Sequence, residues 1–168
     1  MPGKQRGPVN LRGLGEDRGE RMPDVRPEPS DVAALLVADL HLSEKPPVAR
    51  STEPDWFEAM RRQLEELCLL TELYACPVIV AGDIFDKWNP RPELINFALR
   101  RLPDRMICIP GQHDLPYHSY TDKHKSAYGT LTGSEKIIDR LPGIPITVGD
   151  GAKAIRLHGF PWGFPVEP

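Results

Sequence analysis

Aspartate and histidine residues cluster directly after three short apolar runs of this 168-residue chain. Carboxylates and imidazoles bind divalent metal ions, and histidine transfers protons near neutral pH. A metal centre with an acid or base beside it is therefore the chemistry these residue types favour. The three segments are Asp39-Leu40-His41, Gly82-Asp83-Ile84-Phe85-Asp86 and Gly111-Gln112-His113-Asp114.

Each segment taken alone has a plainer interpretation. Asp39 would serve as a cap in a loop between a strand and a helix, and His41 as a surface loop residue. A Gly-Asp pair ends many strands, and Gly-x-His-Asp is typical of a turn. The order of the three segments, each placed after a buried run, favours one shared site over three unrelated turns.

The elements that must position these segments alternate between strands and helices. Residues 33–38, 77–81 and 106–109 are short and apolar, which predicts buried strands. Apolar residues recur at three and four positions over 55–74 and 92–102, which predicts helices, the first with Pro54 at its start and Thr52 or Glu53 as cap. A further helix is predicted over 123–131, and weaker strands over 146–148 and 154–157. The pattern predicts an α/β fold with a βαβαβ core and a parallel sheet covered on both faces.

A parallel sheet brings the carboxyl ends of its strands to one edge, so the three segments should converge. Converging carboxylates repel one another unless a cation neutralises them, and a pair of divalent ions would do so. The alternation of side chains along a strand would point Asp39 and His41 to the same side. Gly82 and Gly111 precede the ligand-bearing turns, where the lack of a Cβ permits close approach.

Composition and charge narrow the classes of protein. Proline is abundant, with 19 residues, and residues 1–30 are rich in proline, glycine and arginine, so we expect a disordered tail before a domain over 31–168. The formal net charge of −3 disfavours a broad basic surface for nucleic acid. The chain has no apolar run near the ~20 residues of a membrane helix and no recognisable secretory signal. Together with three cysteines in apolar or helical contexts, this predicts a cytoplasmic protein without membrane partners.

The three segments resemble the signature of the calcineurin-like metallophosphoesterase superfamily, which reads D-x-H, G-D-x-x-D and G-N-H-D/E. The resemblance covers about 31–160, the N-terminal half of such a domain, and implies the core of an αββα sandwich. Residues 115–119 and 124–126 look most like the DNA-repair exonuclease branch, including phage versions. The resemblance implies hydrolysis of phosphodiesters by water activated between two metal ions, most often Mn²⁺, with Fe or Zn²⁺ as alternatives, and makes DNA a candidate substrate.

The resemblance also implies roles for individual residues. Asp39 and His41 would bind the first metal, Asp83 would bridge both, and Gln112 would offer its amide oxygen to the second. His113 would lie over the scissile phosphate as general acid or charge stabiliser, with the Asp86 carboxylate orienting its imidazole. Position 112 is Asn in the family, so the longer Gln side chain predicts a second metal site about 10–100-fold weaker.

The family's downstream histidines are mostly missing, because no Gly-His-x-His follows Asp114. We therefore expect an incomplete domain. His158 is either the family's single downstream ligand or part of the strand that precedes it, while His118 and His124 favour packing or loop roles. Trp88 and Tyr117 flank the predicted site, where they would form an apolar lid or stack on an aromatic group. The alternatives to a phosphodiesterase are a phosphomonoesterase, a small-molecule phosphodiesterase, and a catalytically weak remnant that binds a metal or a partner.

Overall fold

Strands and helices alternate along the chain in the computed structural model, which describes residues 27–140 and 143–164. The α-helices are α1 (Trp56–Tyr74), α2 (Pro92–Arg101) and α3 (Ala127–Gly133). The strands are β1 (Leu35–Val37), β2 (Val78–Val80), β3 (Met106–Cys108), β4 (Ile137–Asp139), β5 (Ile146–Val148) and β6 (Ile155–Leu157). Short 3₁₀ helices are η1 (Pro29–Asp31), η2 (Val48–Arg50), η3 (Pro116–His118), η4 (Tyr120–Lys125) and η5 (Gly151–Lys153).

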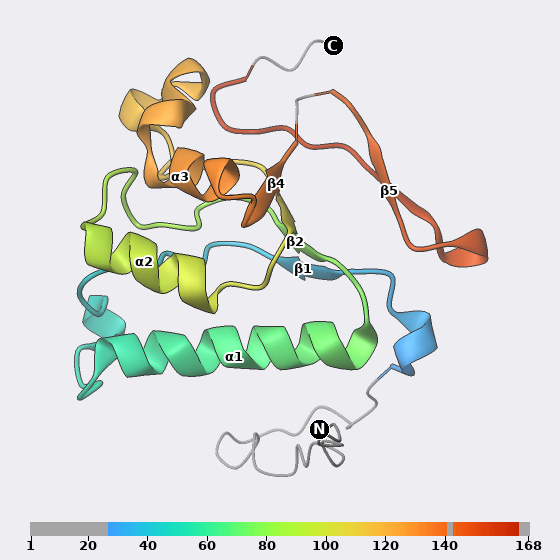
Figure 1. The fold of residues 1–168 in the computed structure, drawn as a ribbon, viewed down its shortest axis with the longest axis horizontal. Coiled ribbons are helices and arrows are strands. Elements are labelled where there is room, and N and C mark those ends of the chain that lie inside the picture. The colour runs from blue at the N-terminus through green and yellow to red at the C-terminus, as the bar shows by residue number, and fades with distance from the viewer. Residues whose placement is uncertain (1–26, 141–142, 165–168) are drawn as a thin grey trace, which may run out of the picture.

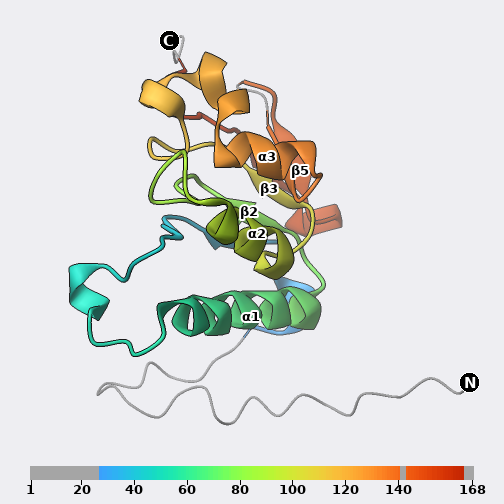
Figure 2. The same ribbon diagram turned by 60° about the vertical axis from the view of Figure 1, so that its left-hand side comes forward.

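Four of the strands form one parallel sheet in the order β1-β2-β3-β4. Leu36 pairs with Ile79 and Ile79 with Ile107, so the strands are in step along the sheet. The predicted α/β fold with a parallel βαβαβ core is confirmed. Because each right-handed crossover moves to the next strand in the same direction, α1, α2 and α3 all lie on one face, as Figures 1 and 2 show.

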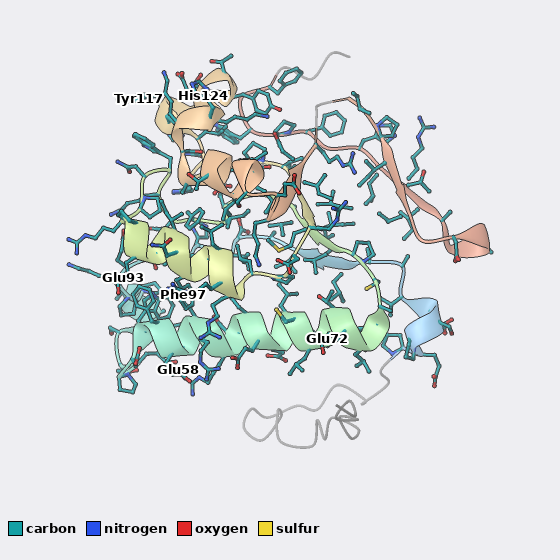
Figure 3. All side chains as sticks on the ribbon, in the orientation of Figure 1. Glu58, Glu72, Glu93, Phe97, Tyr117 and His124 are labelled. Atoms are coloured by element: carbon teal, nitrogen blue, oxygen red, sulfur yellow. The ribbon has the colours of Figure 1, made fainter. Side chains whose placement is uncertain are left out.

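The core lies between this face of the sheet and the three helices. Successive strand residues point to opposite faces, so every second residue of β2 and β3 is buried beneath the helices. Phe97 of α2 (labelled in Figure 3) meets Phe57 of α1 edge to face, with ring centroids 5.3 Å apart. The buried residues of this core include Met60, Leu64, Val78, Val80, Leu94, Met106, Cys108, Tyr128 and Leu131.

The opposite face of the sheet is only partly covered, so the prediction of a sheet covered on both faces is wrong. Within the described residues no helix lies on it, and Leu36 of the edge strand β1 is 73% exposed. The β5–β6 hairpin covers part of this face and leaves a cavity of about 150 Å³ against Ile79 and Ile107. The sequence could not predict this, because apolar strand residues on both faces do not reveal the order of the strands.

The helix boundaries differ from the prediction in two places. Asp55 caps α1, since its carboxylate accepts a hydrogen bond from the Glu58 amide at 3.0 Å, so the predicted cap at Thr52 or Glu53 is wrong. Ser126 caps α3 in the same way, accepting from the Gly129 amide at 3.2 Å. The single helix predicted over 123–131 is therefore two elements, η4 and α3, that meet at Ser126.

Three further predictions concern strands, cysteines and the amino-terminal tail. Strand β4 was not predicted, and the last two predicted strands form an antiparallel hairpin. Cys76 and Cys108 are buried and Cys68 is partly buried, all as free thiols whose pKa values burial raises. The predicted disordered tail over 1–30 lies almost wholly outside the described residues. Among the helices of the described ranges, none has the length and apolar character to cross a membrane.

Candidate metal centre

The loops after β1 and β2 run side by side beyond the ends of their strands. The amide of Asp39 donates to the Gly82 carbonyl at 3.3 Å, and that of His41 donates to the Asp83 carbonyl at 3.0 Å. A parallel bridge between Leu42 and Phe85 continues the pairing. These main-chain bonds place the Asp39–His41 segment beside the Gly82–Asp86 segment at the carboxyl edge of the sheet.

The backbone, rather than the strand pleat, turns the side chains of this edge toward one another. Asp39, His41 and Asp83 have φ angles of 55°, 43° and 52°, in the left-handed region that non-glycine residues rarely adopt. β1 ends at Val37, so the prediction that a strand pleat aims Asp39 and His41 is wrong. Left-handed residues at a shared site are typical of functional positions, where surrounding contacts offset the strain.

His41 lies at the centre of the convergent groups. Its Nε2 atom is 4.0 Å from Asp39 Oδ1 and 4.0 Å from Asp83 Oδ2. Its Nδ1 atom is 3.6 Å from Asp86 Oδ1, and its ring meets the His113 ring edge-on with centroids 5.0 Å apart. Two candidate metal-binding groups thus share His41: Asp39, His41 and Asp83, and His41, Asp86 and His113.

Asp83 joins the loop after β2 to the loop after β3. Its Oδ1 atom accepts a hydrogen bond from the His113 amide at 2.8 Å, which leaves Oδ2 facing His41. A Cβ on Gly111 would lie 2.2 Å from Asp83 Oδ1, so only glycine permits this approach. Gly82 is equally confined: its φ is +99° and its Cβ would lie 2.9 Å from the Gly111 Cα.

His113 is held by Asp86, through a different atom from the one expected. Its Nδ1 atom is 3.1 Å from the main-chain oxygen of Asp86, and a carbonyl oxygen only accepts, so Nδ1 carries the proton. The Asp86 carboxylate instead faces His41. This corrects the expectation that the Asp86 carboxylate fixes the imidazole. When the ring is neutral, its Nε2 atom has a lone pair available to a metal ion or a proton.

Asp114 has a structural role that the sequence analysis did not assign. The side chain is fully buried, and its two oxygens accept hydrogen bonds from the amides of Ile84 at 3.2 Å, Phe85 at 3.1 Å and Gly111 at 3.0 Å. Burial raises the pKa of this carboxyl, against the three donors that lower it. The bond to Gly111 is local, because Gly111 lies three residues earlier, so a turn at Gly111–Asp114 could be expected from the sequence. The bonds to the β2 loop depend on the fold.

The remaining candidate residues lie at varying distances from this group. Gln112 stands between Gly111 and His113, and its main-chain oxygen is 3.2 Å from Nδ1 of His118. Nδ1 of His124 is 3.2 Å from the Thr121 carbonyl oxygen. His158 lines the cavity on the helix-free face and belongs to neither metal-binding group found in the described residues.

The donor set fits a divalent metal. It combines carboxylate oxygens with imidazole nitrogens, the ligands of Mn²⁺, Fe and Zn²⁺ centres. Three carboxylates, from Asp39, Asp83 and Asp86, converge on one histidine, an arrangement that a bound cation would stabilise. The Nδ1 atom of His41 is buried without a hydrogen-bond partner, so a polar atom here lacks the partner that buried polar groups normally have.

Comparison with known proteins places this geometry in a family. No curated protein matches the chain significantly. The family model for calcineurin-like phosphoesterases matches residues 33–163, which includes all three loops and most of the chain. Members of that family are metal-dependent phosphoester hydrolases, in agreement with the convergent carboxylates and histidines at the carboxyl edge of the sheet. The chain belongs to the calcineurin-like phosphoesterase family.

Proposed function

We propose that this protein hydrolyses phosphodiester bonds at the metal centre built on His41. The observation that carries the proposal is the convergence of the Asp39, Asp83 and Asp86 carboxylates on His41, with the His113 ring against it. Carboxylates that converge beside histidines suit two metal ions placed to act on one phosphoryl group. Mn²⁺ is the ion we expect, with Fe or Zn²⁺ as alternatives.

Each protein group has a task that its position supports. Asp39, His41 and Asp83 would hold the first ion, and the second would take its ligands from Asp83 and Gln112. When bound, the ions would supply Lewis acidity toward the phosphoryl oxygens and lower the pKa of water. Asp83 also fixes the His113 loop through the amide bond at 2.8 Å, so the two sides of the site cannot separate freely.

His113 is the group we assign to proton transfer. The Asp86 carbonyl holds its Nδ1 proton and so determines the direction of the ring. Protonated at Nε2, the imidazolium would donate to the leaving oxygen or stabilise charge on the phosphoryl group. Histidine is the side chain that most often serves as a general acid in enzymes.

Two other functions fit the same residues. A phosphomonoesterase or small-molecule phosphodiesterase would use the same centre with a different substrate. A weakly active remnant would bind a metal or a partner without efficient turnover. Action on DNA, as in the exonuclease branch, belongs to the proposal and would require a local source of positive charge, because the chain is acidic overall.

Hydrolysis of bis-p-nitrophenyl phosphate with added Mn²⁺ tests the proposal. Asp83→Asn should reduce kcat/KM more than about 100-fold, because Asp83 belongs to the first ligand group and also holds the His113 loop through its amide bond. His113→Ala should reduce kcat by about 10²–10⁴-fold, the range of a lost general acid. Asp104→Asn is the matched control, since Asp104 is 85% exposed and pairs with Lys136 away from the centre.

The outcomes separate the candidate functions. Undiminished activity in Asp83→Asn would contradict the assigned centre. Hydrolysis of p-nitrophenyl phosphate in preference to the diester would favour the monoesterase. Calorimetric binding of Mn²⁺ that Asp83→Asn abolishes, without hydrolysis by the wild type, would identify the remnant.

A further inference from the structure

Two aromatic side chains belong to the loops that carry the candidate ligands and take no part in the functions assigned so far. Trp88 follows Asp86 by two residues, and Tyr117 follows His113 by four. Their ring centroids are 6.0 Å apart, with the ring planes tilted by 44°. The loops after β2 and β3, which carry the candidate ligands, therefore each contribute one ring to an aromatic pair.

Tyr117 has an exposed side chain and a left-handed backbone conformation. Its side chain is 84% exposed although its chain neighbours Leu115 and Pro116 are buried, and its φ and ψ angles are 52° and 26°. A left-handed backbone is unfavourable for a non-glycine residue, and exposing a large ring gains no burial. Figure 3 shows Tyr117 at the periphery of the molecule. The fold thus fixes an aromatic ring where folding alone gives no reason for one.

Trp88 supports that ring from the protein side. The Ala127 amide at the start of α3 donates to the Trp88 carbonyl at 2.8 Å, which anchors the indole-bearing residue to the body of the domain. Trp88 is partly buried, whereas Tyr117 is exposed. With the indole on one side, the tyrosine ring still offers a face to solvent.

Contacts tie the aromatic pair to the centre. His118, next to Tyr117, has its Nδ1 atom 3.2 Å from the Gln112 carbonyl oxygen, and His113 Nδ1 is 3.1 Å from the Asp86 carbonyl oxygen. The turn that carries Tyr117 is therefore fastened to the His113 loop. A ring that is 84% exposed covers little of the centre, which argues against the apolar lid considered from the sequence.

We propose that Tyr117, supported by Trp88, stacks on a planar aromatic group attached to the substrate phosphate. The inference rests on the proposed function and names its substrate class: phosphoesters in which an aryl group, or a nucleobase carried on a ribose, is attached to the phosphate. Aromatic stacking on a flat ring is tolerant of the exact base, so this contact selects a class of substrate rather than one sequence.

Equilibrium binding to the Mn²⁺-loaded full chain provides the test, by titration calorimetry with four phosphate probes. Adenosine monophosphate should bind about 5- to 150-fold more tightly than ribose-5-phosphate, which lacks the base. Phenylphosphonate compared with methylphosphonate gives the same contrast for an aryl group, so the two pairs distinguish nucleobase from aryl recognition.

Variants at position 117 assign the contrast to this ring. Tyr117→Ala should reduce the preference for the aromatic probe to less than about twofold, while Tyr117→Phe, which keeps the ring, should retain it. Tyr117→Asn serves as a second ring-free variant, because asparagine tolerates the left-handed backbone. Tyr74→Ala removes a tyrosine at the far end of α1 and should keep the wild-type preference.

Three results would overturn the inference. Equal binding of aromatic and non-aromatic probes by the wild type refutes aromatic recognition and leaves the phosphoesterase centre standing. A preference that persists in both Tyr117→Ala and Tyr117→Asn places the recognition elsewhere. Failure of every probe and of inorganic phosphate to bind overturns the phosphate site itself, and the stacking proposal with it.

Discussion

The loops after β2 and β3 are fastened by buried side-chain hydrogen bonds, whereas the loop after β1 is held by main-chain bonds and leaves its Asp39 side chain mostly exposed. The Asp114 carboxylate, fully buried, joins the first two loops through three amide hydrogen bonds. The Asp39 side chain on the β1 loop is 72% exposed, against 18% for Asp83. The centre thus has a held side, formed by the loops after β2 and β3, and an open side, formed by the exposed Asp39 side chain of the loop after β1.

This difference separates stability from function within a single site. On the held side a substitution disturbs packing, buried hydrogen bonds and ligand geometry together, since the same residues serve all three. On the open side a side chain is positioned mainly by its main chain, so its carboxylate should be removable at little cost to the fold. Four substitutions test whether the contrast holds, and they are ordered by the expected loss of stability.

Gly111→Ala should have the largest effect. The new Cβ would lie 2.2 Å from Asp83 Oδ1 and 2.4 Å from the Asp83 amide nitrogen, so the two loops must separate. We expect a loss of about 3 kcal/mol in the free energy of unfolding, measured by urea denaturation, and weaker Mn²⁺ binding. The control is Gly133→Ala, where a Cβ meets nothing within 4 Å. Equal stability of the two variants would contradict a tightly held side.

Asp114→Asn should come second. An amide keeps one oxygen, so at least one of the three main-chain donors faces an NH₂ group and stays unpaired. The expected loss is about 2 kcal/mol, because an unsatisfied buried donor costs about 1–3 kcal/mol. Denaturation of this variant beside Asp104→Asn, whose carboxylate is exposed, gives the comparison. A loss no greater than that of Asp104→Asn would show that the three hydrogen bonds to the Asp114 carboxylate contribute little to stability.

Lys123 provides a pH test of the segment that follows the held loops. Its ammonium donates to Asp139 Oδ2 and to the Tyr120 hydroxyl, and Asp139 also accepts from Tyr128 at 2.9 Å. Burial lowers the pKa of the Lys123 ammonium, but its bonds to Asp139 and Tyr120 outweigh this and raise the pKa above its ordinary 10.5. The stabilisation is therefore complete below pH 10.5 and is lost as the pH rises through the folded-state pKa.

The expected signature is a stability difference between wild type and Lys123→Met that stays constant from neutral pH to about pH 10 and shrinks above it. Thermal unfolding across the alkaline range measures it. Lys125→Met is the control, because Lys125 pairs with Asp122 at the surface, and surface pairs contribute at most about 1 kcal/mol. A difference that does not change with alkaline pH would contradict the assigned ion pair.

Asp39→Asn should have the smallest effect on stability. The side chain is mostly exposed and the main-chain bond to Gly82 remains, so we expect a change of less than about 0.5 kcal/mol in the free energy of unfolding. Mn²⁺ affinity should still fall more than about tenfold, because one carboxylate of the first ligand group is lost. Calorimetry with denaturation on the same sample measures both. A loss of stability comparable to that of Asp114→Asn would abolish the contrast between the sides.

The sequence predicted what depends on local pattern and on parallel topology. Buried apolar runs located β1, β2 and β3, and the carboxyl-edge rule brought Asp39, His41, Asp83, Asp86 and His113 together as the structure does. The left-handed backbone at Asp39 was not predictable, because its cause is the neighbouring β2 loop. The hydrogen bond between His113 Nδ1 and the Asp86 carbonyl was not predictable either, because it depends on where the loops after β2 and β3 meet. The assigned roles of the ligands remain predictions.

The hydrogen bonds accepted by the buried Asp114 carboxylate also bear on the order in which the protein folds. Its carboxylate reaches amides of the β2 loop that lie about thirty residues earlier in the chain. Those bonds gain nothing until β2 and β3 have paired across α2, so closing that long loop must precede them. Asp83 meets His113 under the same constraint. The carboxyl edge of the sheet should therefore be among the last parts to form, and a chain that has acquired its helices and sheet would not yet bring the candidate ligands together.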